Sequence, residues 1–177
     1  MKIPAAVIAL FVLLFCQFAV AGDETSPFFK VPVGSTLTLN QPLTIQPHHA
    51  SVRMQYGRIM PYSQIDKFYA NCDFEVRTIA KQPTIINPDT FLITKVVNEE
   101  DVAAGDWTVY AFFGSGDAGP SHVDYMTVMY LESVKQPDVL RITCTHWEDP
   151  VEAEFLSIQQ MRKAMGKILT LNIRSAD

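Results

Sequence analysis

Apolar and polar residues alternate along most of the chain, with the period of two that is typical of half-buried β-strands. Cys72, Phe74 and Val76, for example, alternate with charged residues, so we expect the Cys72 side chain on the apolar face of its strand. The segments with this pattern are 36–45 with an interruption at Pro42, 51–56, 72–77, 84–86, 91–97, 107–113, 122–133, 139–145 and 169–173. The pattern predicts a chain that is mainly β.

The strongest hairpin pattern joins residues 107–113 to residues 122–133. Both segments are rich in β-branched and aromatic residues, and a glycine-rich connector separates them. The charged stretch 98–101 is expected to be a solvated loop.

One amphipathic helix is predicted near the C-terminus, over residues 149–166. Asp149 is a typical N-cap, Pro150 suits the first helical position, and Gly166 can end the helix in the left-handed conformation. Apolar residues three or four positions apart form a stripe that is expected to pack on the sheet. A short helical turn is expected within residues 61–69.

These elements predict a single β-rich domain, an antiparallel sandwich or a partly closed barrel with one C-terminal amphipathic helix against it. The domain would occupy residues 22–177, about 156 residues, which is long enough to bury a hydrophobic core. The formal net charge is −5 and no basic cluster occurs, which disfavours nucleic acid and anionic lipid surfaces as partners.

Residues 1–21 have the pattern of a signal peptide. Lys2 gives a positive start, an apolar run follows, and Ala19 and Ala21 are the small residues that signal peptidase requires before Gly22. Cleavage would leave a periplasmic or secreted protein, and only the leader would contact the membrane, before it is removed. A retained anchor is the alternative, although the apolar run is close to the lower limit for crossing a bilayer.

Removal of the leader, which contains Cys16, leaves Cys72 and Cys144 as an even pair. Their spacing fits neither a C-x-x-C redox motif nor a zinc knuckle, so a structural disulfide is predicted in an oxidising compartment. Cys144 is expected on the same strand face as Ile142 and Leu140. The alternative is a free nucleophilic or redox thiol, but no base lies beside either cysteine in the sequence.

The segment His146-Trp147-Glu148 is the first candidate binding site. It lies between Cys144 and the predicted helix cap, so its backbone would be held from both sides, and an ordered tryptophan among polar groups suits ligand binding. In the alternative interpretation, Trp147 covers the first turn of the helix. Trp107 and Tyr125 are further candidates that could line the mouth of a barrel.

No catalytic residue, metal site or cofactor is assigned from the sequence. Residues 114–119 match G-x-G-x-x-G, but Pro120 and another β-rich run follow, so a hairpin tip is predicted there and not a dinucleotide site. The enzymatic alternative is a secreted hydrolase or metal-dependent enzyme that uses His122 and His146 with nearby acids.

The layout of the chain resembles an uncharacterised family of small secreted or periplasmic proteins of Gram-negative bacteria. The resemblance rests on the leader and on the segments Cys72-Asp73-Phe74-Glu75-Val76, Ile142-Thr143-Cys144 and His146-Trp147-Glu148-Asp149-Pro150. It implies no activity and no functional residue. The function expected from the sequence is therefore non-catalytic, with an unknown small molecule or an envelope protein as partner.

Overall fold

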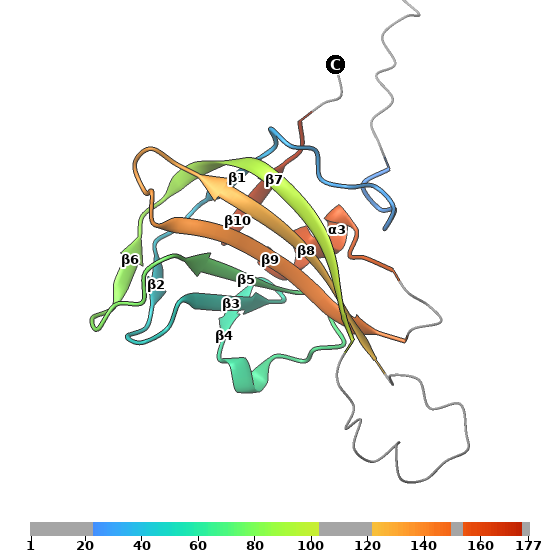
Figure 1. The fold of residues 1–177 in the computed structure, drawn as a ribbon, viewed down its shortest axis with the longest axis horizontal. Helices are drawn as coiled ribbons and strands as arrows, with labels where there is room; N and C mark the ends of the chain where they lie inside the picture. The colour runs from blue at the N-terminus through green and yellow to red at the C-terminus, as the bar shows by residue number, and fades with distance from the viewer. Residues whose placement is uncertain (1–22, 103–121, 150–153, 175–177) are drawn as a thin grey trace, which may run out of the picture.

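The computed structural model describes residues 23–102, 122–149 and 154–174. Eight antiparallel strands form one curled sheet in the order β10-β1-β7-β8-β9-β5-β3-β4, and β2 pairs with β6 in a small second sheet (Figure 1). The strands are β1 (Thr36–Leu39), β2 (Leu43–Ile45), β3 (Ser51–Gln55), β4 (Arg58–Met60), β5 (Asn71–Val76), β6 (Thr84–Ile86), β7 (Asp89–Val102), β8 (Val123–Glu132), β9 (Val139–Glu148) and β10 (Leu169–Asn172). The predicted mainly β fold is confirmed as an antiparallel half-barrel.

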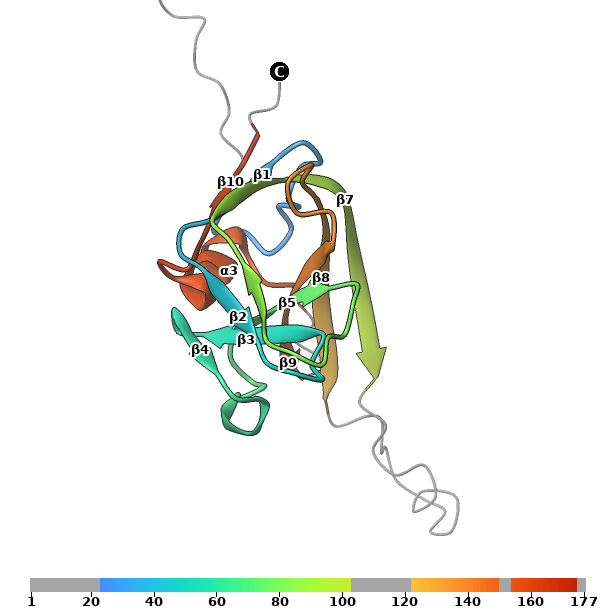
Figure 2. The same ribbon diagram turned by 90° about the vertical axis from the view of Figure 1, so that its left-hand side faces the viewer.

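The helix α3 (Ile158–Met165) lies across the open side of the half-barrel. It contacts β10 at one end of the sheet and β3 and β5 at the other, and Figure 2 shows it between these strands. Its C-terminal residue Gly166 meets Gly57 of the β3–β4 turn so closely that a Cβ on Gly166 would lie 2.4 Å from the Gly57 Cα. Glycine at both positions therefore lets the helix close on the sheet.

The hydrophobic core fills the concave side of the sheet, beneath α3. Phe74 of β5 and Phe91 of β7 are fully buried, with their ring centroids 5.8 Å apart. From the helix, Ile158, Met161 and Met165 pack into the same core. Because side chains alternate between the two faces of a strand, the residues between the core positions of β5 and β9 point to the convex side.

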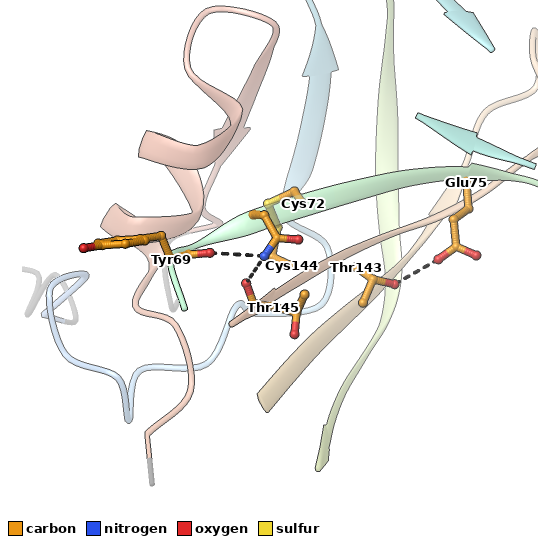
Figure 3. The surroundings of a disulfide bond; sticks show 7 residues. Tyr69, Cys72, Glu75, Thr143, Cys144 and Thr145 are labelled. Atoms are coloured by element: carbon orange, nitrogen blue, oxygen red, sulfur yellow. Dashed lines mark hydrogen bonds between the residues drawn. A yellow bond between two sulfur atoms is a disulfide. The ribbon is translucent and has the colours of Figure 1, made fainter. Parts of the chain in front are cut away.

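The predicted disulfide is present between β5 and β9. Cys72 and Cys144 are directly opposite in the strand register, with their Cα atoms 4.0 Å apart, and both are fully buried (Figure 3). Cys72 shares the inner face with Phe74 and Val76, as predicted. The expectation that Leu140 lies on this inner face of β9 is wrong. The register shifts between Glu75 and Val76, so Val139 takes the inner position and Leu140 lies outside the core.

The predicted start of the C-terminal helix is wrong, whereas its end is right. Ser157, not Asp149, is the N-cap: its hydroxyl accepts from the Gln160 backbone N–H, and the Gln160 side chain accepts from the Ser157 N–H. This reciprocal capping box stabilises the first turn at Ile158. At the other end, Gly166 is the C-cap as predicted, but its φ of 57° and ψ of −129° are not those of the expected left-handed helical conformation.

The predicted pairing of strand β8 is also corrected. Its neighbours are β7 and β9, and the charged stretch 98–101, expected to be a loop, belongs to β7 and pairs with β8 out to Val102 and Val123. Residues 107–113, the expected hairpin partner, and the glycine-rich motif 114–119 lie outside the described residues.

Three local expectations differ from the structure as well. Segment 36–45 is not one bent strand, because β1 joins the large sheet and β2 the small one. The helical turn predicted within 61–69 is limited to the 3-10 helix η1 (Tyr62–Gln64). Finally, β3 ends at Gln55, since Tyr56 has a φ of 53° at the β3–β4 turn. None of the helices in the three described ranges is long and apolar enough to cross a membrane.

Reduction of the Cys72–Cys144 disulfide is expected to lower the free energy of unfolding by about 4 kcal/mol, because the bond closes a loop of 72 residues in the unfolded chain. Urea unfolding of oxidised and dithiothreitol-reduced protein, followed by tryptophan fluorescence, measures the difference. The double variant Cys72→Ala/Cys144→Ala is the control, and it should unfold near the reduced midpoint. Equal midpoints for oxidised and reduced protein would contradict a stabilising disulfide.

Candidate functional site

A polar hollow of about 350 Å³ lies on the convex face of the sheet, over strands β3, β5, β9 and β8. Six charged side chains line it, three basic and three acidic, together with polar and aromatic residues. The charged residues are Arg53, Lys67, Asp73, Glu75, Asp124 and Arg141, and the others are Tyr62, Asn71, Met126, Thr143, Thr145 and Trp147. The hollow has the size of a small-molecule site but a more polar lining than most such sites.

Strand alternation places these side chains on the convex face. Asp73 and Glu75 lie between the core positions of β5, and Thr143 and Thr145 flank the buried Cys144 on β9. In the antiparallel register Asp73 is opposite Thr143 and Glu75 is opposite Arg141. The strand pair that the disulfide cross-links on its inner face therefore forms the floor of the hollow on its outer face.

Glu75 and Arg141 form a two-pronged ion pair across this floor. The Arg141 Nε and Nη2 atoms donate to the two Glu75 carboxylate oxygens at 2.8 and 3.0 Å. The Thr143 hydroxyl adds a third bond to Glu75 at 3.0 Å, visible in Figure 3. The hydrogen bond to Glu75 raises the pKa of Arg141, and the three hydrogen bonds fix the position of the Glu75 carboxylate.

Asp73 is less well satisfied. Its Oδ2 forms an ion pair with Arg53 Nε at 3.2 Å, but its buried Oδ1 has no hydrogen-bond partner among the described residues. Burial raises the pKa of the Asp73 carboxyl, and the nearby Arg53 charge and the Ser51 hydroxyl oppose this increase only in part. A carboxylate with one orphaned oxygen costs stability, so its presence in the hollow calls for an explanation.

Lys67 forms the rim of the hollow with two aromatic rings. Its Nζ lies 4.3 Å from the centroid of the Trp147 ring and 5.5 Å from that of Tyr62. The backbone N–H of Trp147 donates to the Lys67 carbonyl at 2.7 Å, which ties the loop to the end of β9. No carboxylate of the described residues lies within ion-pair distance of the Lys67 ammonium.

The buried Gln55 side chain holds the loop that carries Tyr62 and Lys67. Its amide donates to the carbonyls of Asp66 and Tyr69 at 2.7 and 3.1 Å, and its oxygen accepts from the Asp66 N–H at 3.1 Å. The side chain uses both donors and its acceptor, which is why a glutamine can be fully buried there. The loop is therefore fixed at a definite height above the sheet.

The predicted binding segment on β9 divides between the two faces. Trp147 lies on the convex face and lines the hollow, as a binding residue should. His146 points to the opposite face, where it packs against Tyr125 and its Nδ1 lies 3.4 Å from a Glu148 oxygen. Trp107 lies outside the described residues.

The alternative interpretation, that Trp147 covers the first helical turn, does not fit the contacts. Its ring stacks on His122, with centroids 5.9 Å apart, and meets the edge of Phe68 at 5.8 Å. The helix begins only at Ile158, eleven residues further along the chain.

The structure does not bring His122 and His146 together. The His122 ring packs on Trp147 and Phe68 on the convex side, whereas His146 is buried on the other face with its Nε2 2.8 Å from the Glu154 carbonyl. Across residues 23–102, 122–149 and 154–174, no group of three or more histidine, cysteine or acidic side chains is placed to hold a metal ion.

Sequence reasoning missed most of the hollow. The signal was present in Asp73, Glu75 and Thr143, which alternate with core residues, but such positions are usually only solvated. What the sequence could not show was that β5 and β9 are adjacent in a register that opposes Glu75 to Arg141. Nor could it show that the loop around Lys67 returns over this face.

Comparisons of the chain with protein-family models, with curated proteins and with solved structures found no match. The hollow must therefore be interpreted from its own chemistry.

Substitution Asp73→Asn is expected to stabilise the protein at neutral pH. Since burial raises the folded-state pKa above the usual 3.8, the carboxyl's contribution to stability is present below that value and is lost as the pH rises through the folded-state pKa. The neutral amide avoids that loss. Thermal unfolding at about pH 7 and about pH 3, on either side of the carboxyl range, should therefore show a gain at pH 7 that shrinks in acid.

Asp89→Asn is the matched control, because the Ser133 hydroxyl lowers the pKa of the Asp89 carboxyl. That contribution is present above pH 3.8 and is lost in acid, so Asp89→Asn should destabilise the protein at pH 7. A lower melting temperature for Asp73→Asn at pH 7 would show that the Arg53 ion pair outweighs the desolvation of Asp73.

Proposed function

We propose that the protein is an exported, non-catalytic binding protein that holds a small polar ligand in the hollow on the convex face. The observation that carries this proposal is the incomplete bonding of Asp73 and Lys67. An oxygen of Asp73 lacks a hydrogen-bond donor, and the Lys67 ammonium lacks a carboxylate partner, among the described residues. Both side chains line a hollow of about 350 Å³.

Incomplete bonding of this kind supports a binding role because it is costly to the folded protein. A buried unpaired oxygen loses its bonds to water without replacement, which costs about 1–3 kcal/mol. Such groups are rare in natural proteins, and functional sites are among the places where they occur. A ligand that supplies the missing partners would recover this energy on binding.

The walls of the hollow support the proposal through their rigidity. The floor consists of paired strands that are cross-linked by the Cys72–Cys144 disulfide, and the Glu75–Arg141 ion pair spans it. Buried Gln55 anchors the loop that forms the rim. A site built on fixed elements loses little conformational entropy when its ligand binds.

Export is proposed from the leader pattern in residues 1–21, and the disulfide supports it. Disulfide bonds persist in the periplasm and outside the cell but are rare in the cytosol. A binding protein in such a compartment would meet solutes and envelope components directly.

The enzymatic alternative, a hydrolase or metal-dependent enzyme based on His122 and His146, has less support. The two imidazoles lie on opposite faces of the sheet, and each packs among its own neighbours. An envelope protein as partner is favoured by one observation: Tyr56, Ile59 and Tyr69 are about half exposed around the β3–β4 hairpin, whose strand β4 ends the sheet.

Native mass spectrometry of protein exported from expressing cells tests the binding function. A bound small molecule is expected on the wild type and should be lost in Met126→Trp, because the larger ring fills the hollow from β8. Ile85→Trp on β6, a position exposed to solvent and away from the hollow, is the matched control and should keep the ligand.

Equal ligand occupancy in all three proteins would place the ligand elsewhere and overturn the proposed site. A bound protein in place of a small molecule, removed by Ile59→Asp and kept by Met126→Trp, would favour the envelope-protein function. Melting temperatures of the variants, measured in parallel, show whether each is folded.

A further inference from the structure

Resting on the binding function proposed above, we infer that the ligand is a small zwitterion, an amino acid or a similar molecule with one carboxylate and one ammonium group. Its carboxylate binds Lys67 and its ammonium binds Asp73. Each end of such a molecule supplies a partner that the hollow lacks.

The carboxylate end is assigned by comparing the three cations of the hollow. Arg141 is bound at two points by Glu75, and Arg53 faces Asp73 at 3.2 Å. Lys67 alone among them has no carboxylate partner within the described part of the chain, and its three N–H donors need acceptors. The Trp147 and Tyr62 rings stabilise its positive charge without supplying a hydrogen-bond acceptor.

The ammonium end is assigned by the same comparison among the acids. Glu75 accepts three hydrogen bonds, from Arg141 and Thr143, and Asp124 accepts one from Thr145. Of the three, only Asp73 has a buried oxygen without a hydrogen-bond partner among the described residues. An ammonium group would give it both a donor and a second positive charge.

Access to the Asp73 oxygen requires a small movement of the rim. The Tyr62 ring is 59 % exposed and stacks on the Arg53 guanidinium, whose carbon lies 4.2 Å from the ring centroid. Rotation of the exposed Tyr62, together with the partly exposed Arg53 side chain, would open the hollow toward Asp73 without a change in the β-strands.

Other ligand chemistries fit the hollow less well. A sugar would need an uncovered aromatic face, but Lys67 and His122 already contact the Trp147 ring and Arg53 covers Tyr62. A dianionic phosphate would lie among three acidic side chains and would find only one cation of the described lining, Lys67, without a carboxylate partner. An apolar ligand would supply neither a donor to the Asp73 oxygen nor an acceptor to the Lys67 ammonium.

Isothermal titration calorimetry with a series of straight-chain amino acids tests the inference, from glycine to 6-aminohexanoate. One length should match the separation of the two groups, and it should bind at least about tenfold more tightly than the alkanoate or the alkylamine of equal length. Each of these analogues supplies only one of the two missing partners.

Two variants test which side chain binds the carboxylate of the ligand and which binds its ammonium group. Lys67→Met keeps the length of the side chain and removes its charge, and it should weaken the zwitterion and the alkanoate by about tenfold or more. Asp73→Asn should reduce affinity for the zwitterion to that for the alkanoate. The surface variants Lys81→Met and Asp138→Asn change charge by the same amounts outside the hollow, and they should bind as the wild type does.

The inference is overturned if the alkanoate binds as tightly as the best zwitterion, or if no member of the series binds. In either case the proposed function stands if native protein still carries a small molecule that Met126→Trp removes. If no amino acid of the series binds and native protein also carries no small molecule that Met126→Trp removes, the hollow is not a binding site.

Discussion

The antiparallel pair β5–β9 is the element on which both faces of this sheet depend. On the inner face, its Cys72–Cys144 disulfide lies within the hydrophobic core. On the outer face, the intervening residues become the floor of a charged hollow. Because a shift of one residue would exchange the two faces, the same register protects the core and assembles Glu75 with Arg141.

The closure of the half-barrel explains why the site lies outside. Helix α3 covers the concave side and packs apolar side chains into it, whereas the polar hollow lies on the convex side. Polar residues on the convex side gain an enclosed space only because a loop returns over them. The buried Gln55 fixes that loop, so a single amide sets the depth of the hollow.

Features that depend on residues close together in the sequence were predicted well, whereas features that depend on contacts between distant segments were not. Alternation located most strands and placed Cys72 inward, and Gly166 marked the end of the helix correctly. Asp149 looked like a cap, but the reciprocal bonds of Ser157 decide the helix start. Trp147 was predicted as a binding residue and lines the hollow, whereas the positions of Lys67 and Asp73 there depend on the register and on the loop.

The central claim is that the hollow holds a carboxylate whose bonding is incomplete until a ligand arrives. Titration of the Asp73 carboxyl carbon by ¹³C NMR tests this claim most directly. The account predicts a pKa above the usual 3.8 in the free protein, and a lower pKa when a bound ammonium group stabilises the charged form. A pKa at or below 3.8 in the free protein, unchanged by any ligand, would contradict it.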